Sequence, residues 1–235
     1  MPTKNRGQHP NDHQLFSKKW LPILKEAVDD MVYLLTRGYT PNSSVEIVGN
    51  RYQLNKRQRM AILRISSSES EIKARNAKVL SPTDLRHQTV FVDGFNLLII
   101  LESAMSGAYI FKSRDGTYRD ISGVHGSYKR VRQTESVIKM VGNTLVGLKV
   151  QKVKWLLDKP ISNSGRLKQN LEAIATANNF NWEVALVNNP DKILATSEHI
   201  VISADGWVLD HAARWFNLGA LMIEQQLDKV NIIAV

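Results

Sequence analysis

Three runs of apolar, β-prone residues in this sequence each end at an aspartate. They are TVFVD, which ends at Asp93, VKWLLD, which ends at Asp158, and HIVISAD, which ends at Asp205. Helical patterns separate these runs, and an alternation of strand and helix is typical of a parallel sheet with crossover helices. Because the carboxyl ends of parallel strands open onto one crevice, we expect the three aspartates to converge there.

Three carboxylates in one crevice repel one another unless a cation lies between them. Oxygen ligands of this kind suit Mg²⁺ or Mn²⁺. The first hypothesis is therefore a metal site at Asp93, Asp158 and Asp205 that supports phosphodiester chemistry. Asp93 also has a plainer interpretation, since aspartates often cap the helix that they precede.

Polar residues that follow the runs extend the candidate site. Asn96 lies in the turn after Asp93, where it can orient a phosphate or the aspartate itself. The segment LLDKPISNSGR continues past Asp158 with a stiff turn, three polar side chains and an arginine at the start of a helix. Free N–H groups and a cation at a helix N-terminus favour phosphate binding. The candidates are Ser162, Asn163, Ser164 and Arg166, and the alternative is a capped loop with a surface arginine.

Other charged residues are weaker candidates. Asp210, five residues after Asp205, is either a further metal ligand or a solvated helix residue. The hairpin segment YIFKSRDGTYRDI and the residues after it contain charges that either grip substrate as a flexible lip or form an ordinary surface turn. These are Arg114, Asp115, Arg119, Asp120 and His125. His9 and His13 have helical spacing, but without further ligands we expect them to be exposed.

The strand and helix patterns predict two parts. Residues 1–87 are expected to form a small basic all-helical domain, with residues 1–12 disordered, a helix from Leu15 to Gly38, and three shorter helical segments. Residues 88–235 are expected to form an α/β domain with a mostly parallel, doubly wound sheet. Its expected strands are 89–93, 152–157, 182–187, 199–203 and 229–235, its expected helices are 95–106, 129–148, 163–178 and 207–226, and a hairpin is expected at 109–121.

Composition limits the classes of function. The net charge is +9, and residues 1–88 carry 15 Lys and Arg against 8 Asp and Glu, whereas residues 89–235 carry 16 against 14. A basic excess of this kind favours polyanions such as nucleic acid, although it is also compatible with a solvated basic surface. The chain has no cysteine, which excludes disulfides, thiolate metal sites and cysteine nucleophiles.

Several other classes lose their main support. The sequence has no GxGxxG after its first strand, no GxxxxGK[ST], no GxSxG and no HExxH, motifs that mark nicotinamide, P-loop, serine-hydrolase and zincin enzymes. It also has neither an apolar stretch of about 18 residues nor the apolar core of a signal peptide. We therefore expect a cytoplasmic protein without a membrane partner.

VDGFN at the first strand, the aspartate that ends a middle strand, and SADGWVLD together resemble the PIN/NYN-like (Rossmannoid) nuclease superfamily. More closely, the chain resembles an uncharacterised archaeal and bacterial family that pairs a helical domain of unknown function with a PIN-like domain. The stretches LLTRGYTPNSSVEIVGNRYQLNKRQRMAILR, VDGFNLLIILESAMSGAYIFKSRDGTYRDISGVHGSY and LDKPISNSGRL carry this resemblance over about residues 15–225.

The resemblance implies that Asp93, Asp158 and Asp205 bind Mg²⁺ or Mn²⁺ for RNA hydrolysis, with Asn96 supporting the first. The chain departs from the NYN pattern at Trp207, where a second acid is usual. Asp210 substitutes for that acid, or the site holds one metal ion, or catalysis has been lost.

The leading prediction is a metal-dependent endoribonuclease or related phosphodiesterase. The main alternative is a non-catalytic RNA- or ribosome-binding protein on the same scaffold, and a weaker one is a hydrolase of small phosphorylated substrates. A homodimer through the helix near 207–226 is expected by analogy.

Overall fold

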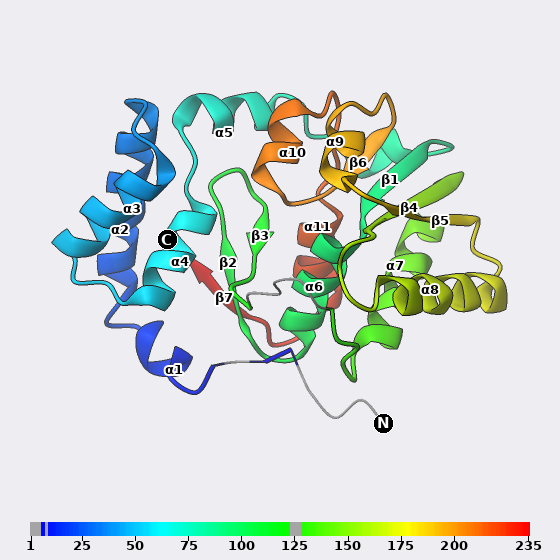
Figure 1. Ribbon diagram of the computed structural model, residues 1–235, viewed down its shortest axis with the longest axis horizontal. Coiled ribbons are helices and arrows are strands. Elements are labelled where there is room, and N and C mark those ends of the chain that lie inside the picture. Colours follow the sequence, from blue (N-terminus) through cyan, green and yellow to red (C-terminus); the bar gives the residue numbers. More distant parts are fainter. Residues whose placement is uncertain (1–5, 8, 123–127) are drawn as a thin grey trace.

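The computed structural model describes residues 6–7, 9–122 and 128–235, which form two sheets enclosed by helices (Figure 1). The main sheet has the strand order β5-β4-β1-β6, and the smaller sheet has the order β3-β2-β7. The strands are β1 Thr89–Asp93, β2 Tyr109–Lys112, β3 Tyr118–Arg119, β4 Lys152–Asp158, β5 Trp182–Val187, β6 Ile200–Ile202 and β7 Asn231–Ala234.

Helices precede and connect these strands. The first group is α1 Asp12–Leu15, α2 Leu21–Thr36, α3 Pro41–Arg51, α4 Lys56–Ile65 and α5 Glu69–Asn76, followed by the 3₁₀ turn η1 Pro82–Leu85. The second group is α6 Gly94–Met105, α7 Thr134–Gly147, α8 Ser164–Asn178, α9 Pro190–Ala195, α10 Gly206–His211 and α11 Leu218–Gln226.

The main sheet is parallel throughout and is covered on both faces. β1 pairs with β4 on one side and with β6 on the other, and β4 pairs with β5. Successive side chains of a strand point to opposite faces. Accordingly, Val90 and Val92 lie in the core with α6, α7, α8 and α11, whereas Leu156 and Val201 lie in the core with α9 and α10. The predicted α/β class with a parallel sheet flanked by helices is confirmed.

The smaller sheet lies between the main sheet and the N-terminal helices (Figure 1). β2 pairs antiparallel with β3 and parallel with β7. Phe111 of β2 and Ile233 of β7 are buried in one core with residues of α2, α3 and α4. The N-terminal helices therefore share their core with strands from the second half of the chain, and no separate all-helical core is observed within the described residues.

Local signals explain where the N-terminal helices begin and end. α2 buries its apolar face, including Leu24, Val28 and Met31, and the chain then passes through Gly38 at φ +85°. This left-handed conformation favours glycine and ends the helix. α4 and α5 each begin with a capping box, in which Asn55 and Ser68 satisfy backbone N–H groups.

Two predicted elements differ from the structure. The expected helix over 207–226 is two helices, α10 and α11, because the chain turns inward between them to bury Trp215, which bridges Val79 and Val201. The expected last strand joins the smaller sheet through β2 instead of extending the main sheet. The structure also adds α9, which the sequence patterns did not predict.

The remaining expectations concern the ends and the membrane. The expected disorder over 1–12 falls partly outside the described residues, which include residues 6–7 and 9–12, with α1 beginning at Asp12. Among the helices that the structure describes, none combines the length and apolar character needed to cross a membrane.

Candidate functional site

The three predicted aspartates lie at the carboxyl edge of adjacent strands. Asp93 ends β1, Asp158 ends β4, and Asp205 follows β6 and caps α10. A fourth carboxylate, Asp191 in the first turn of α9, joins them after β5. Asp93, Asp158 and Asp191 line one cavity of about 350 Å³, and the charge of Asp205 acts on both Asp93 and Asp191. We call these four residues the acidic site.

Asp93 is the buried member of the acidic site, with 7% of its surface exposed. One carboxylate oxygen accepts a hydrogen bond from Ser203 Oγ at 2.8 Å, and the other caps α6 through the Asn96 N–H at 3.4 Å. Burial raises the pKa of Asp93 to about 7, and the neighbouring charges of Asp191 and Asp205 contribute, whereas the Ser203 hydrogen bond opposes the shift. Capping is therefore part of its role, as the plainer interpretation holds, but a cap does not require this burial.

Gly94 allows the start of α6 to approach β4 closely. A Cβ atom at this position would lie 2.5 Å from Leu157 Cδ2 and 3.1 Å from the Leu156 carbonyl oxygen. A side chain here would push α6 away from the sheet. The glycine thus keeps the start of α6 close to β4, where Asp93 lies in register with Leu156.

Asp158 and Asp191 are less buried than Asp93, and neither carboxylate forms a salt bridge among the described residues. Asp158 Oδ1 is buried without a hydrogen-bond partner, and burial raises the pKa of this carboxyl group. The pKa of Asp191 is raised by burial and by the charges of Asp205 and Asp158. Among the described residues, no salt bridge joins any of the four acids to a basic side chain.

Asn96 and Ser203 tie the ends of β1 and β6 together. Asn96 Oδ1 accepts a hydrogen bond from the Ala204 N–H at 2.9 Å, and Ser203 Oγ accepts one from the Asp205 N–H at 3.0 Å. Asp205 in turn accepts a hydrogen bond from the Val208 N–H at 3.1 Å. Asn96 therefore orients the strand ends that carry the acids.

The carboxylate oxygens of the acidic site suit a hard divalent cation, but they do not form a closed cage of ligands. Within the described part of the chain, no three His, Asp or Glu side chains are grouped closely enough to hold a metal ion directly. Mg²⁺ commonly retains several water ligands and is held by only one or two carboxylates. Four neighbouring carboxylates without a salt bridge among the described residues, one of them with the unpartnered Asp158 oxygen, fit a hydrated ion of this type.

Asp210 does not join the acidic site. Its carboxylate accepts two hydrogen bonds from Arg75, at 2.6 Å from Nε and 2.9 Å from Nη2. Arg75 also donates to Asp115 at 2.8 Å and to Ser67 at 2.8 Å. Burial lowers the pKa of Arg75, but the hydrogen bonds and charges of these two acids outweigh it and raise that pKa overall. Asp210 thus joins α10 to α5.

Side chains of the predicted phosphate loop after Asp158 are engaged by backbone carbonyl groups of the protein. Asn163 Nδ2 donates to the Tyr128 carbonyl oxygen at 2.9 Å, and Ser164 Oγ donates to the Lys159 carbonyl oxygen at 3.1 Å. Asn163 occupies the cap position of α8 without a side-chain cap bond. Ser162 and Arg166 are exposed, and Arg166 lines a different cavity, of about 420 Å³, beside Asn163.

The hairpin is anchored on the N-terminal helices. Arg114 pairs with Asp29 of α2, Ser113 Oγ donates to the Ile65 carbonyl oxygen at 2.9 Å, and Asp115 is buried against Arg75. These contacts hold the hairpin as a packed element and do not fit the flexible lip that the sequence suggested.

The histidine candidates do not contribute to the acidic site. His9 and His13 are exposed, and His13 Nδ1 lies 2.9 Å from the Pro10 carbonyl oxygen. His125 lies outside the described residues.

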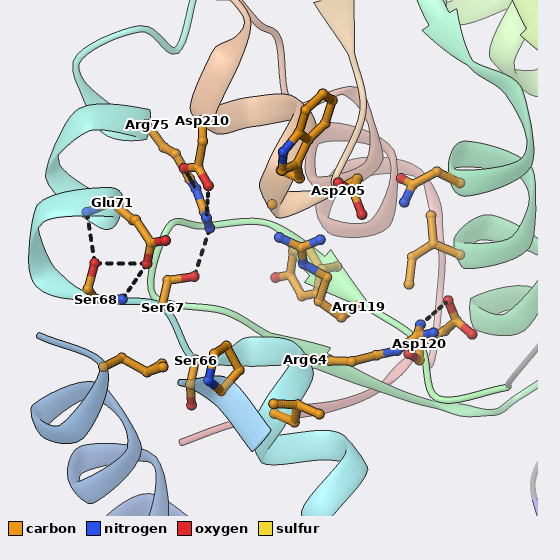
Figure 2. A pocket seen from close by; sticks show the side chains of 18 of the residues that line it. Arg64, Ser66, Ser67, Ser68, Glu71, Arg75, Arg119, Asp120, Asp205 and Asp210 are labelled. Atoms are coloured by element: carbon orange, nitrogen blue, oxygen red, sulfur yellow. Dashed lines mark hydrogen bonds and ion pairs between the residues drawn. The ribbon is translucent and has the colours of Figure 1, made fainter. Parts of the chain in front are cut away.

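A larger cavity of about 600 Å³ adjoins the acidic site through Asn96 and Asp205 (Figure 2). Its walls come from α4, the segment between α4 and α5, β3 and α10, so it lies between the N-terminal helices and the α/β part. Arg119 and Trp207 line it. We call it the Arg119 cavity.

Sequence reasoning missed Asp191 and Ser203. The segment ALVNNPD repeats the pattern used for Asp158, with a predicted strand, polar residues, a proline and an acid. That pattern was sufficient to include Asp191. Ser203 had no such signal, since a single serine before Ala204 and Asp205 is unremarkable until β6 is placed beside β1.

Comparison with known families separates the chain into two matched regions. Residues 82–221 match the family described as Domain of unknown function (DUF5616), and residues 23–78 match the family described as Protein of unknown function (DUF434). The first match covers more than half of the chain. The chain belongs to the DUF5616 family.

This DUF5616 protein is also similar to an archaeal protein along most of its length. An uncharacterized protein of Methanocaldococcus jannaschii is 31% identical over 188 residues, which cover 77% of this chain and 90% of the relative. No solved structure matches. The acidic site lies within the DUF5616 region, whereas the Arg119 cavity takes residues from both matched regions.

Proposed function

We propose that this protein is a metal-dependent phosphodiesterase that hydrolyses RNA. The observation that carries the proposal is the convergence of Asp93, Asp158, Asp191 and Asp205 at one sheet edge, with no salt bridge to a basic side chain among the described residues. Such a site is costly unless a cation offsets its charge. Mg²⁺ or Mn²⁺ held there would polarise the phosphate and lower the pKa of a bound water molecule.

The side chains divide the work in this proposal. Asp93, oriented by Ser203, and Asp205, oriented by its cap bond to Val208, would hold the cation from adjacent strand ends. Asp158 Oδ1 has no hydrogen-bond partner, and the raised pKa of its carboxyl group suits it to accept the proton of the attacking water. Asp191 supplies further negative charge beside them.

The net charge of +9 supports a polyanionic substrate. RNA is the substrate class implied by the resemblance of VDGFN and SADGWVLD to PIN/NYN-like nucleases. The second candidate, an RNA-binding protein without catalysis, draws on the same charge but leaves the acidic site without a role.

The test is cleavage of a labelled single-stranded RNA in Mn²⁺, compared among wild type, Asp93→Asn, Asp158→Asn and Asp228→Asn. Asp228 is exposed and outside the acidic site, so its variant controls for loss of one negative charge. We expect cleavage by wild type and Asp228→Asn, and a loss of at least about 100-fold in the other two. RNA binding without cleavage by wild type would refute the enzyme and favour the second candidate.

Heat measured on Mn²⁺ addition gives an independent readout. Wild type and Asp228→Asn should bind the ion, and Asp93→Asn should bind it weakly or not at all.

A further inference from the structure

The Arg119 cavity contains a buried cation whose hydrogen-bonding capacity is largely unused. The Arg119 side chain is 11% exposed, and its Nε is buried without a partner. Its ionic contact, from Nη2 to Asp115 Oδ2, is 3.6 Å long. Asp115 is already engaged by Arg75 at 2.8 Å and by Thr117 Oγ1 at 2.6 Å. A guanidinium carries five N–H donors in a planar fork, which suits a phosphate.

The other basic residues of the cavity are paired. Arg75 is committed to Asp210 and Asp115, and Arg64 Nη1 donates to the Asp120 carbonyl oxygen at 2.8 Å. Glu71 accepts from the Ser68 N–H and hydroxyl in the α5 capping box. Figure 2 shows Arg64, Arg75 and Glu71 beside their partners Asp120, Asp210 and Ser68, with the Arg119 guanidinium extending inward toward the side of Asp205.

A second unpartnered group lies in the same cavity. Ser66 Oγ is buried without a hydrogen-bond partner and lines the Arg119 cavity. Two donors that the protein leaves unsatisfied in one cavity indicate a polar ligand, because buried polar groups are normally hydrogen-bonded.

The rim of the cavity adds an aromatic surface. Trp207 is 49% exposed, and its ring packs on that of His211 with centroids 4.5 Å apart. Tyr39, from the turn before α3, is 52% exposed and lines the same cavity. Nucleobases stack on exposed aromatic rings of this kind.

We propose that the Arg119 cavity binds the nucleotide next to the cleaved phosphate, with its phosphodiester on Arg119 and its base on Trp207. This rests on the proposed function, since Asp205 and Asn96 join the cavity to the acidic site. Asp205 also lines the cavity, and its charge acts on Arg119. This negative charge favours a singly charged phosphodiester over a doubly charged terminal phosphate.

The test measures binding without hydrolysis. Fluorescence anisotropy of a labelled oligoadenylate of about ten nucleotides is followed in a metal chelator, at several salt concentrations. The variants are Arg119→Gln, Arg119→Lys, Trp207→Ala and Trp207→Phe. Arg86→Gln is the control, because Arg86 is exposed and precedes β1 at the opposite edge of the sheet.

We expect Arg119→Gln to weaken binding about 10-fold and to reduce the slope of log affinity against log salt by about 0.7, the value for one contact to a single strand. Arg119→Lys should keep the slope but lose affinity, since it lacks the fork. Trp207→Ala should weaken binding about 10-fold at an unchanged slope, and Trp207→Phe should restore most of the affinity. Arg86→Gln should match wild type in both.

Equal affinities and slopes for Arg119→Gln, Trp207→Ala and wild type would overturn the proposal, as would the absence of strand binding by wild type. Thermal unfolding of each variant establishes that it is folded. Because no cleavage is required, this result is separate from the cleavage test. Binding through Arg119 without any hydrolysis would leave the cavity assigned and refute the proposed catalysis.

Discussion

Replacing Asp93 with asparagine should stabilise the protein at alkaline pH. The carboxyl group is buried, and its pKa is about 7 in the folded protein against an ordinary value of 3.8. At pH values between these two pKa values, the folded state therefore holds a proton that the unfolded chain has lost. For a raised carboxyl pKa, the stabilising contribution is complete below the unfolded pKa and is lost as pH rises through the folded pKa.

The magnitude follows from the shift. A difference of about 3 pH units at 1.36 kcal/mol per unit makes the ionised Asp93 unfavourable by about 4 kcal/mol at pH 8. At pH 5 Asp93 is protonated in the folded protein but mostly ionised in the unfolded chain. This difference lowers the free energy of unfolding by about 2 kcal/mol. The stability of Asp93→Asn relative to wild type should therefore rise by about 2–3 kcal/mol between these two pH values.

The assay is urea unfolding of the metal-free proteins in a chelator at pH 5 and pH 8. Asp228→Asn, an exposed substitution, should show no such change. The reasoning is refuted if the difference between Asp93→Asn and wild type stays constant with pH, or if the variant becomes relatively less stable at pH 8.

Four further predictions concern packing and the cation. Arg75→Met should reduce the free energy of unfolding by about 3–5 kcal/mol in urea, because it removes the 4% exposed guanidinium that now satisfies the buried Asp115 and the partly buried Asp210. In α7, Gly142→Ala should destabilise by about 1–3 kcal/mol, since its Cβ would lie 2.1 Å from Phe180 Cε2. Gly147→Ala in the same helix, with no atom within 4 Å of the new Cβ, should stabilise by about 0.5–1 kcal/mol. Mn²⁺ at about 100 times its dissociation constant should stabilise wild type by about 2.7 kcal/mol, as measured by urea unfolding, and should not stabilise Asp93→Asn.

The main sheet could be predicted because buried parallel strands have continuous apolar sequences. The runs that end at Asp93 and Asp158 match β1 and β4, and strand adjacency then brings Asp205 to the same edge. β7 shows the limit of this reasoning. Its four residues, NIIA, indicate a strand but not a partner, and its pairing with β2 depends on where the N-terminal helices leave an apolar surface.

Long-range polar partners could not be predicted from the sequence. Asp210 was open to interpretation as a metal ligand because Arg75 lies 135 residues away. The same limit applies to Arg119, whose charge was visible in the hairpin but whose burial and free N–H groups depend on the packing of α4 and α10 around it.

The sharing of one core by α2, α4, β2 and β7 has a consequence for synthesis on the ribosome. Ile233 is 5% exposed among side chains from residues 16–65, so the first helices to emerge must wait for the last strand before their apolar faces are covered. Contacts of such sequence separation slow folding and prolong exposure of apolar surface. Nascent chains stalled before residue 231 should therefore hold these helices in a protease-sensitive state, long after the helices themselves have formed.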